Sequence, residues 1–186
     1  AGGGTLLTAH IVPLAVGRGF ALEPASLLLS AYAAAGLIGA LLFGWLSDRF
    51  GARNTLVINA VGQIVLWGAL MMIGVYGMMM TIAALIGLFT TSILAVHSAA
   101  INEIFGRENF SAVLGMSYLP KLVFISGSAP LAGFLFDYAG DYKIAPLVQI
   151  VGFAAALLGF LFLPAQSAAL SRLAARPITA GTGGAA

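Results

Sequence analysis

Residues 44–54 read Gly-Trp-Leu-Ser-Asp-Arg-Phe-Gly-Ala-Arg-Asn, and this stretch interrupts a chain that is otherwise almost entirely apolar. It holds one acid and two arginines, three of the fourteen charged residues (eight basic, six acidic) among 186. Glycines, Gly44 and Gly51, stand on both sides of the first charges. A charged turn between two long apolar runs predicts a point where the chain leaves a hydrophobic layer and re-enters it.

The composition is not that of a water-soluble domain. Hydrophobic residues make up 61% and charged residues 8% of the chain, whereas a soluble domain carries about 25% charged residues. The basic residues are scattered singly, so no surface suits nucleic acid. The chain has no cysteine, which excludes disulfides and thiol chemistry. It opens Ala-Gly-Gly-Gly without Met or a signal-peptide pattern, and we therefore expect a fragment of a longer protein.

Charges and turn residues divide the chain into six apolar stretches, each about long enough to cross a bilayer core of about 30 Å as a helix. The sequence therefore predicts an all-α fold, a polytopic membrane helical bundle with six transmembrane helices. The final residues, rich in Ala, Gly and Ser, predict a disordered cytoplasmic tail over 165–186. The six-helix unit, 1–164, is expected to have spans at about 5–20, 24–47, 55–75, 78–101, 111–136 and 144–164.

The basic residues near the predicted helix ends give an orientation. Five arginines fall on one side and two basic residues on the other, and the richer side is expected to be cytoplasmic. The 44–54 stretch, the connection at 102–109 and the C-terminus then lie inside, in a plasma or inner membrane. The five are Arg49, Arg53, Arg107, Arg172 and Arg176, and the two are Arg18 and Lys143.

Small residues recur at four-residue spacing in the second and fourth predicted spans. Helices in lipid associate by close backbone approach across small side chains. We interpret these positions as packing seams rather than binding surfaces. They are Gly36, Ala40 and Gly44, and Ala83, Gly87, Thr91, Ala95 and Ala99.

The 44–54 stretch resembles the inter-helix loop of the major facilitator superfamily, Gly-x-x-x-Asp-Arg-x-Gly-Arg-Arg/Lys. Four positions match in order and spacing, and Arg53 matches the last basic position, whereas Ala52 replaces a basic residue. The resemblance implies a gating latch on the cytoplasmic side, and a plain topology anchor stays open as the alternative. The matching positions are Gly44, Asp48, Arg49 and Gly51.

A second resemblance lies near the end of the chain. Residues 130–142 look like the phrase Pro-x-x-Ala-Gly-x-x-Phe-Asp-x-x-Gly-x-Tyr of the monocarboxylate transporter and oxalate–formate antiporter branches, with one residue fewer between Pro130 and Ala132. It implies half of a twelve-helix fold, here the C-terminal six-helix half, with an N-terminal six-helix half missing. In that family the third and sixth helices of each half face mainly lipid. The third predicted span agrees, since Asn59 and Gln63 are its only strongly polar residues.

Lys121 is the charged residue that lies well inside a predicted span. Ten residues separate it from the start of the fifth span, or about 15 Å at 1.5 Å per residue. A charge at that depth is costly and usually marks a pathway or a paired site. No Asp or Glu lies within any of the six predicted spans. We expect its counter-charge to be an anionic substrate, a carboxylate of the missing half, or water in a cavity.

The resemblance to oxalate–formate antiporters implies a substrate-binding lysine at the position of Lys121. A structural lysine that pairs with the missing half stays open as the alternative. Branch relatives often add an arginine on the eighth helix, and residues 33–42 contain none. A single carboxylate is therefore favoured over a dicarboxylate.

Three further side chains are candidates to bind substrate at the same depth. Tyr118 shares a helical face with Lys121, and His10 and Tyr32 lie at a similar distance from the other membrane face. His10 is also a candidate for a coupled proton, because imidazole titrates near neutral pH. His97 lies about 6 Å from the inner end of its span, which suits an inner gate. For His10, Tyr118 and His97, a structural hydrogen bond is the alternative.

No nucleophile, base and acid occur together as an enzyme requires, and two histidines without a spaced acid predict no metal site. We expect neither enzymatic activity nor a cofactor. The sequence predicts secondary active transport of small organic anions, monocarboxylates first, by alternating access within membrane lipid. Two alternatives stay open: efflux of amphipathic drugs by a transporter of the same superfamily, and a non-transporting membrane sensor.

Overall fold

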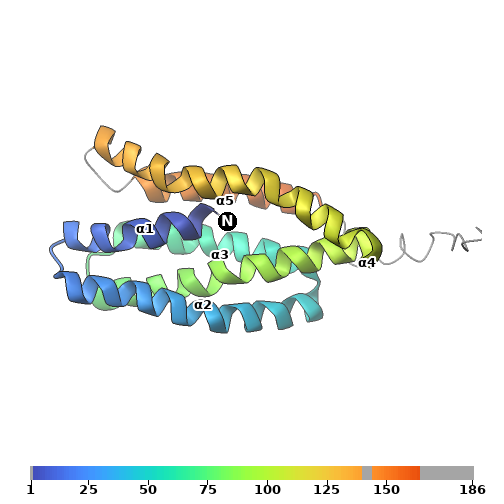
Figure 1. The fold of residues 1–186 in the computed structure, drawn as a ribbon. Coiled ribbons are helices and arrows are strands. Elements are labelled where there is room, and N and C mark those ends of the chain that lie inside the picture. The colour runs from blue at the N-terminus through green and yellow to red at the C-terminus, as the bar shows by residue number, and fades with distance from the viewer. Residues whose placement is uncertain (1, 140–143, 164–186) are drawn as a thin grey trace, which may run out of the picture.

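The computed structural model describes residues 2–139 and 144–163, and every regular element within these ranges is an α-helix. The helices lie roughly along one common axis in an elongated bundle (Figure 1). The predicted tail at 165–186 and the outer-loop residues 140–143 lie outside the described residues. The helices are α1 (Gly2–Gly17), α2 (Leu22–Phe50), α3 (Ala52–Met72), α4 (Tyr76–Ala139) and α5 (Ile144–Leu161).

Helix α4 folds back on itself at one residue. Gly106 has φ 74° and ψ 169°, inside 64 residues that are otherwise helical. We call residues 76–105 the first arm and residues 107–139 the second arm, and Figure 1 shows the two arms converging where α4 turns. The connection expected at 102–109 does reverse the chain, but it consists of Gly106 alone rather than a loop of several residues. The polar residues of that stretch are compatible with helix, and only the glycine adopts the left-handed φ that reverses the chain.

The stretch at 44–54 is also almost wholly helical. Helix α2 continues to Phe50 and α3 begins at Ala52, so Gly51 alone, with φ 83°, forms the turn. The Gly51 N–H donates to the Ser47 carbonyl at 2.8 Å, and Thr55 Oγ1 donates to the Gly51 carbonyl at 3.0 Å. The expected connection at 48–54 thus shrinks to one glycine, and its charged residues lie on the adjoining helical turns.

Helix α2 packs against the first arm of α4 at very close range. A Cβ added to Gly36 would meet the Thr91 side chain, and one added to Gly87 would meet the Tyr32 backbone carbonyl. The predicted seam is confirmed at these positions. It is wrong at Gly44, where a Cβ would meet open space, because the buried stripe of α2 continues through Phe43 and Ser47 instead.

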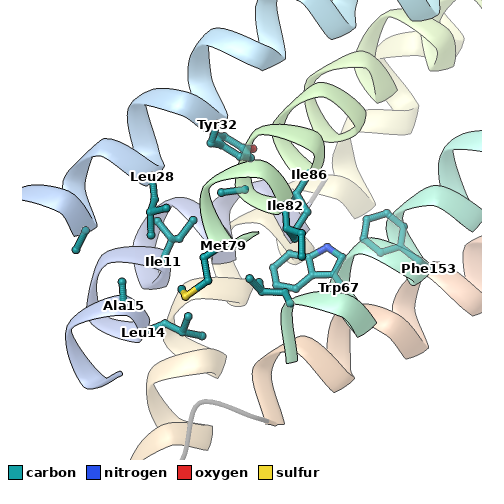
Figure 2. Close-up of a cluster of buried hydrophobic side chains, with 13 residues drawn as sticks. Ile11, Leu14, Ala15, Leu28, Tyr32, Trp67, Met79, Ile82, Ile86 and Phe153 are labelled. Atoms are coloured by element: carbon teal, nitrogen blue, oxygen red, sulfur yellow. The ribbon is translucent and has the colours of Figure 1, made fainter. Parts of the chain in front are cut away.

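A hydrophobic cluster joins all five helices (Figure 2). In it, Trp67 of α3 lies between Phe153 of α5 and the isoleucines Ile82 and Ile86 of α4. A second cluster around Phe43 and Val96 lies nearer to Gly51. These two clusters hold the bundle together along its length.

The outer surface is apolar. Leu37, Leu41 and Met72 are 74%, 80% and 89% exposed, a surface that water would not tolerate over so many residues. Three helices in the described part of the chain are long and apolar enough to cross a membrane, namely Leu22–Phe50, Ala52–Met72 and Tyr76–Gly127, and Pro146–Leu161 is a shorter apolar helix. The fold is the predicted all-α membrane helical bundle.

Helix α3 buries polar side chains that were expected to belong to a mainly lipid-facing helix. Asn59 and Gln63 are both fully buried. The Asn59 amide donates to the Phe89 carbonyl at 2.6 Å, and the Gln63 amide donates to Thr90 Oγ1 at 2.7 Å. A buried amide is tolerated only when it is hydrogen-bonded, so these bonds fix α3 against the first arm of α4.

Candidate functional site

The two arms of α4 are joined by Lys121 and His97. The Lys121 Nζ lies 3.0 Å from the His97 Nδ1, and both side chains are half-buried. His97 was expected near an inner gate and Lys121 at mid-depth, so the sequence did not predict this contact. When the lysine is protonated, Nδ1 accepts a hydrogen bond from its ammonium, and the neutral ring then carries its own hydrogen on Nε2.

The Tyr118 ring completes the surroundings of the ammonium. The Lys121 Nζ lies 4.5 Å from the ring centroid, which is the geometry of a cation–π contact. The two residues are three apart on the second arm, as the shared helical face predicted. Among the described residues, no carboxylate pairs with Lys121. Within the described part of the chain, the neighbours of the cation are thus an imidazole and an aromatic ring, and neither carries a negative charge.

Tyr32 lies elsewhere. It is buried in the hydrophobic cluster at the contact of α2 with α4 (Figure 2). His10 belongs to helix α1, and its side chain lies outside the described residues. Of the four side chains expected in one layer, Lys121 and Tyr118 are in contact, and the substrate-binding roles of all four stay predictions.

Charged side chains cap helix ends around the Gly51 turn. The Arg53 guanidinium donates to the Leu161 carbonyl at the end of α5, at 2.9 Å. The Glu103 carboxylate accepts the Ala52 N–H at the start of α3, with oxygens at 3.2 and 3.4 Å. Both placements suit the helix dipole, which favours a cation at the C-terminus and an anion at the N-terminus.

Glu103 is a residue that the sequence reasoning missed. The carboxylate found at the α3 N-terminus comes from α4, and not from Asp48 of the 44–54 stretch. Asp48 lies exposed on the last turn of α2, and Arg49 stacks beside the rings of Trp45 and Phe50, 5.8 and 6.0 Å from their centroids. The available signal was an acid two residues beyond the fourth predicted span, on the same predicted membrane side as Gly51.

At the opposite end of the bundle, Arg18 caps the C-terminus of α3. Its guanidinium donates to the carbonyls of Ile73 at 2.7 Å and Leu70 at 3.1 Å. Arg18 follows the end of α1, so it fixes α1 against the end of α3. Arg18 at one end of the bundle, and Arg53 and Glu103 at the other, thus bind helix termini. Lys121 lies between these two ends.

An open cavity of about 410 Å³ lies close to Gly106. Three lining residues come from the first arm of α4 and two from the second. They combine a guanidinium, an amide and a hydroxyl with two apolar groups. The lining residues are Ser98, Ala99, Asn102, Arg107 and Phe110. Within the described ranges, no group of three His, Asp or Glu residues could hold a metal ion.

Comparison with known proteins matches nearly the whole chain. The family model described as Major Facilitator Superfamily matches residues 1–180. Monocarboxylate transporter 12 of Mus musculus is 29% identical over 163 residues, which cover 83% of this chain and 33% of that protein. The Homo sapiens protein of the same name is 30% identical over 160 residues, which cover 83% and 31%.

A bacterial protein also matches. The uncharacterized MFS-type transporter YcxA of Bacillus subtilis is 25% identical over 171 residues, covering 88% of this chain and 41% of that protein. The chain thus spans about a third of the length of the monocarboxylate transporters that it matches. With its matched family model and its apolar helices, the chain belongs to the major facilitator superfamily, and within it resembles the monocarboxylate transporters.

Proposed function

We propose that this chain forms one wall of a membrane pathway for small organic anions, with monocarboxylates as the first candidates. The observation that carries the proposal is the Lys121 ammonium, which lies between the His97 imidazole and the Tyr118 ring. A charge inside a membrane bundle is costly and is retained where it has a function. A carboxylate that reaches this point supplies the missing counter-charge.

The geometry leaves two N–H donors of Lys121 available to bind such an anion. An ammonium has three N–H groups, and one of them donates to His97 Nδ1. The remaining two can donate to the oxygens of a carboxylate, and charge-assisted bonds of this kind are the stronger class of hydrogen bond. The apolar second arm around Lys121, with Leu119 and Leu122 exposed, suits the hydrocarbon part of a monocarboxylate.

The other wall of the pathway is proposed to come from a second, N-terminal six-helix half. Alternating access in this superfamily involves rocking of two halves around a site near the midplane. This chain spans about a third of the monocarboxylate transporters that it matches, and these lengths leave room for a second half. The proposed direction places the Gly51 and Gly106 end in the cytoplasm, which is supported by the excess of arginines on that side.

The Gly51 end is proposed to act as an inner latch. Asp48 and Arg49 lie exposed on the last turn of α2, while Arg53 and Glu103 are engaged at the ends of α5 and α3. Exposed charges at a helix end can pair with the other half in one state and separate in the next. The match of this stretch to the superfamily loop supports the proposal.

Transport is tested with the intact transporter that contains this chain, in proteoliposomes, against a panel of labelled mono- and dicarboxylates. We expect saturable uptake of at least one monocarboxylate, lost in Lys121→Ala with insertion unchanged, and partly kept in Lys121→Arg. His10→Ala, assayed with and without a pH gradient, tests whether that histidine carries a coupled proton. Full uptake by Lys121→Ala would exclude the proposed role of the lysine.

A further inference from the structure

The cavity near Gly106 is built by the reversal of α4. On the first arm, Ser98 and Asn102 are four residues apart and so share one helical face. On the second arm, Arg107 and Phe110 begin the returning helix and line the same cavity. Because the φ of 74° at Gly106 turns the chain back on itself, these two pairs of side chains face one space.

The side chains that line the cavity are complementary to an amphipathic anion. Arg107 supplies a fixed fork of N–H donors that matches a carboxylate, and the Asn102 amide adds further donors. Phe110 and Ala99 supply an apolar wall. The Ser98 hydroxyl donates its hydrogen to the Leu94 carbonyl at 3.0 Å, so its oxygen can only accept a hydrogen bond in the cavity. The volume of about 410 Å³ has room for a small organic anion and water.

The position of the cavity relates it to Lys121. On the first arm, the lining residues lie nearer to Gly106 than His97 does. On the second arm, Phe110 precedes Lys121 by eleven residues, or about 16 Å at 1.5 Å per residue. An anion that arrives from the Gly106 end therefore meets Arg107 before it meets the ammonium.

We infer that this cavity is a second anion site, which captures the carboxylate substrate at the Gly106 end and passes it to Lys121. The inference rests on the proposed function, because it takes the substrate to be a carboxylate. Arg107 is exposed and has no acidic partner among the described residues. Arg107 attracts and orients the anion at the water-exposed surface, whereas Lys121 binds the anion inside the bundle.

The test uses the intact transporter in oriented vesicles, with the KM of a transported monocarboxylate measured separately from each membrane side. Arg107→Gln is expected to raise the KM at the Gly106 side by about threefold to tenfold, the range of a partly screened charge interaction. The KM at the other side and the maximal rate should stay unchanged. Arg107→Lys should keep part of the effect, and the KM at the Gly106 side should rise with salt less steeply in Arg107→Gln than in the wild type.

Glu108→Gln is the matched control, because it removes the adjacent exposed charge without touching the cavity lining. It should lower the KM only slightly, through the long-range potential. An unchanged KM in Arg107→Gln, an equal rise at both sides, or an equal and opposite effect of Glu108→Gln would each overturn the capture site. If the proposed function is wrong, the wild type moves no carboxylate, and this outcome differs from each of the three above. The capture site would then be disproved together with the proposed function.

Discussion

The Nζ of Lys121 lies 3.0 Å from the Nδ1 of His97, so a cation and a neutral base join the two arms of α4. The imidazole thereby fixes the orientation of the ammonium, because one N–H group of Lys121 donates a hydrogen bond to His97 Nδ1. His97 is thus a positioning residue for Lys121, and the orientation of the remaining donors depends on it.

Replacement of His97 by leucine removes this acceptor and keeps the bulk. We expect His97→Leu to lower uptake of the monocarboxylate about tenfold, the effect of losing a hydrogen bond to a charged group. His97→Gln, which can still offer an acceptor, should stay within about threefold of the wild type. Initial uptake rates, normalised to inserted protein, measure both. Equal rates for the leucine and glutamine variants would contradict a positioning role.

Gly106 carries the reversal of α4, and a side chain at its φ of 74° is strained. Gly106→Ala should destabilise the protein by about 1–3 kcal/mol, because positive φ combined with an extended ψ is essentially reserved for glycine. The control is Gly115→Ala, where a Cβ meets nothing within 4 Å inside the second arm, and alanine is the better helix former there. Denaturant unfolding in detergent measures the difference. Two variants of equal stability would show that the turn does not need a glycine.

The contact of α2 with α4 depends on Gly87, where a Cβ would meet the backbone carbonyl of Tyr32. Because backbone cannot move aside as a flexible side chain can, we expect Gly87→Ala to cost about 1–3 kcal/mol. Gly68→Ala on α3, where a Cβ has open space, should be neutral or stabilising. The midpoint of thermal unfolding in detergent separates the two, and a neutral Gly87→Ala would disprove the close seam.

The carboxylate of Glu103 lies at the N-terminus of α3. Glu103→Gln keeps an oxygen acceptor for the Ala52 N–H and loses the charge, so it should cost only about 0.3–1 kcal/mol. Glu103→Leu loses the acceptor as well and should cost about 1–3 kcal/mol, because the Ala52 N–H is then left without its partner. Denaturant unfolding of the two variants should therefore rank glutamine above leucine, and the reverse order would refute the cap.

Asp48 belongs to the proposed latch, and its carboxylate lies exposed at the end of α2. Asp48→Asn should slow the maximal transport rate severalfold and leave the order of preference among carboxylates unchanged, since it lies at the turn rather than beside Lys121. Competition assays with unlabelled carboxylates measure the preference. An altered preference, or an unaffected rate, would count against the latch.

The sequence predicts the helical bundle, the membrane setting and the turn at Gly51 because these depend on local composition and on one charged stretch. It does not predict the one-residue reversals. Polar residues around Gly51 and Gly106 read as loops, although they continue the helices on either side. Only the backbone torsions of the two glycines distinguish a sharp turn from a loop of several residues.

The contact between His97 and Lys121 was hidden by a count of helix rise alone. His97 lies nine residues and Lys121 fifteen residues from Gly106, and the difference of six residues corresponds to about 9 Å of helix. A long lysine side chain covers much of this difference, and the count leaves that reach out. Similarly, Glu103 caps a helix that lies far away in sequence, and such a partner follows from tertiary packing alone.

The most direct test of the central claim compares a transported monocarboxylate with its uncharged primary amide, in the wild type and in Lys121→Met. The binding affinity of each ligand for the purified, intact transporter is measured by calorimetry. If the ammonium anchors the carboxylate, the wild type should prefer the acid by about 10- to 100-fold, the value of a charge-assisted hydrogen bond. Lys121→Met should lose this preference and still bind the amide. A methionine variant that keeps the full preference for the acid would contradict the role of Lys121.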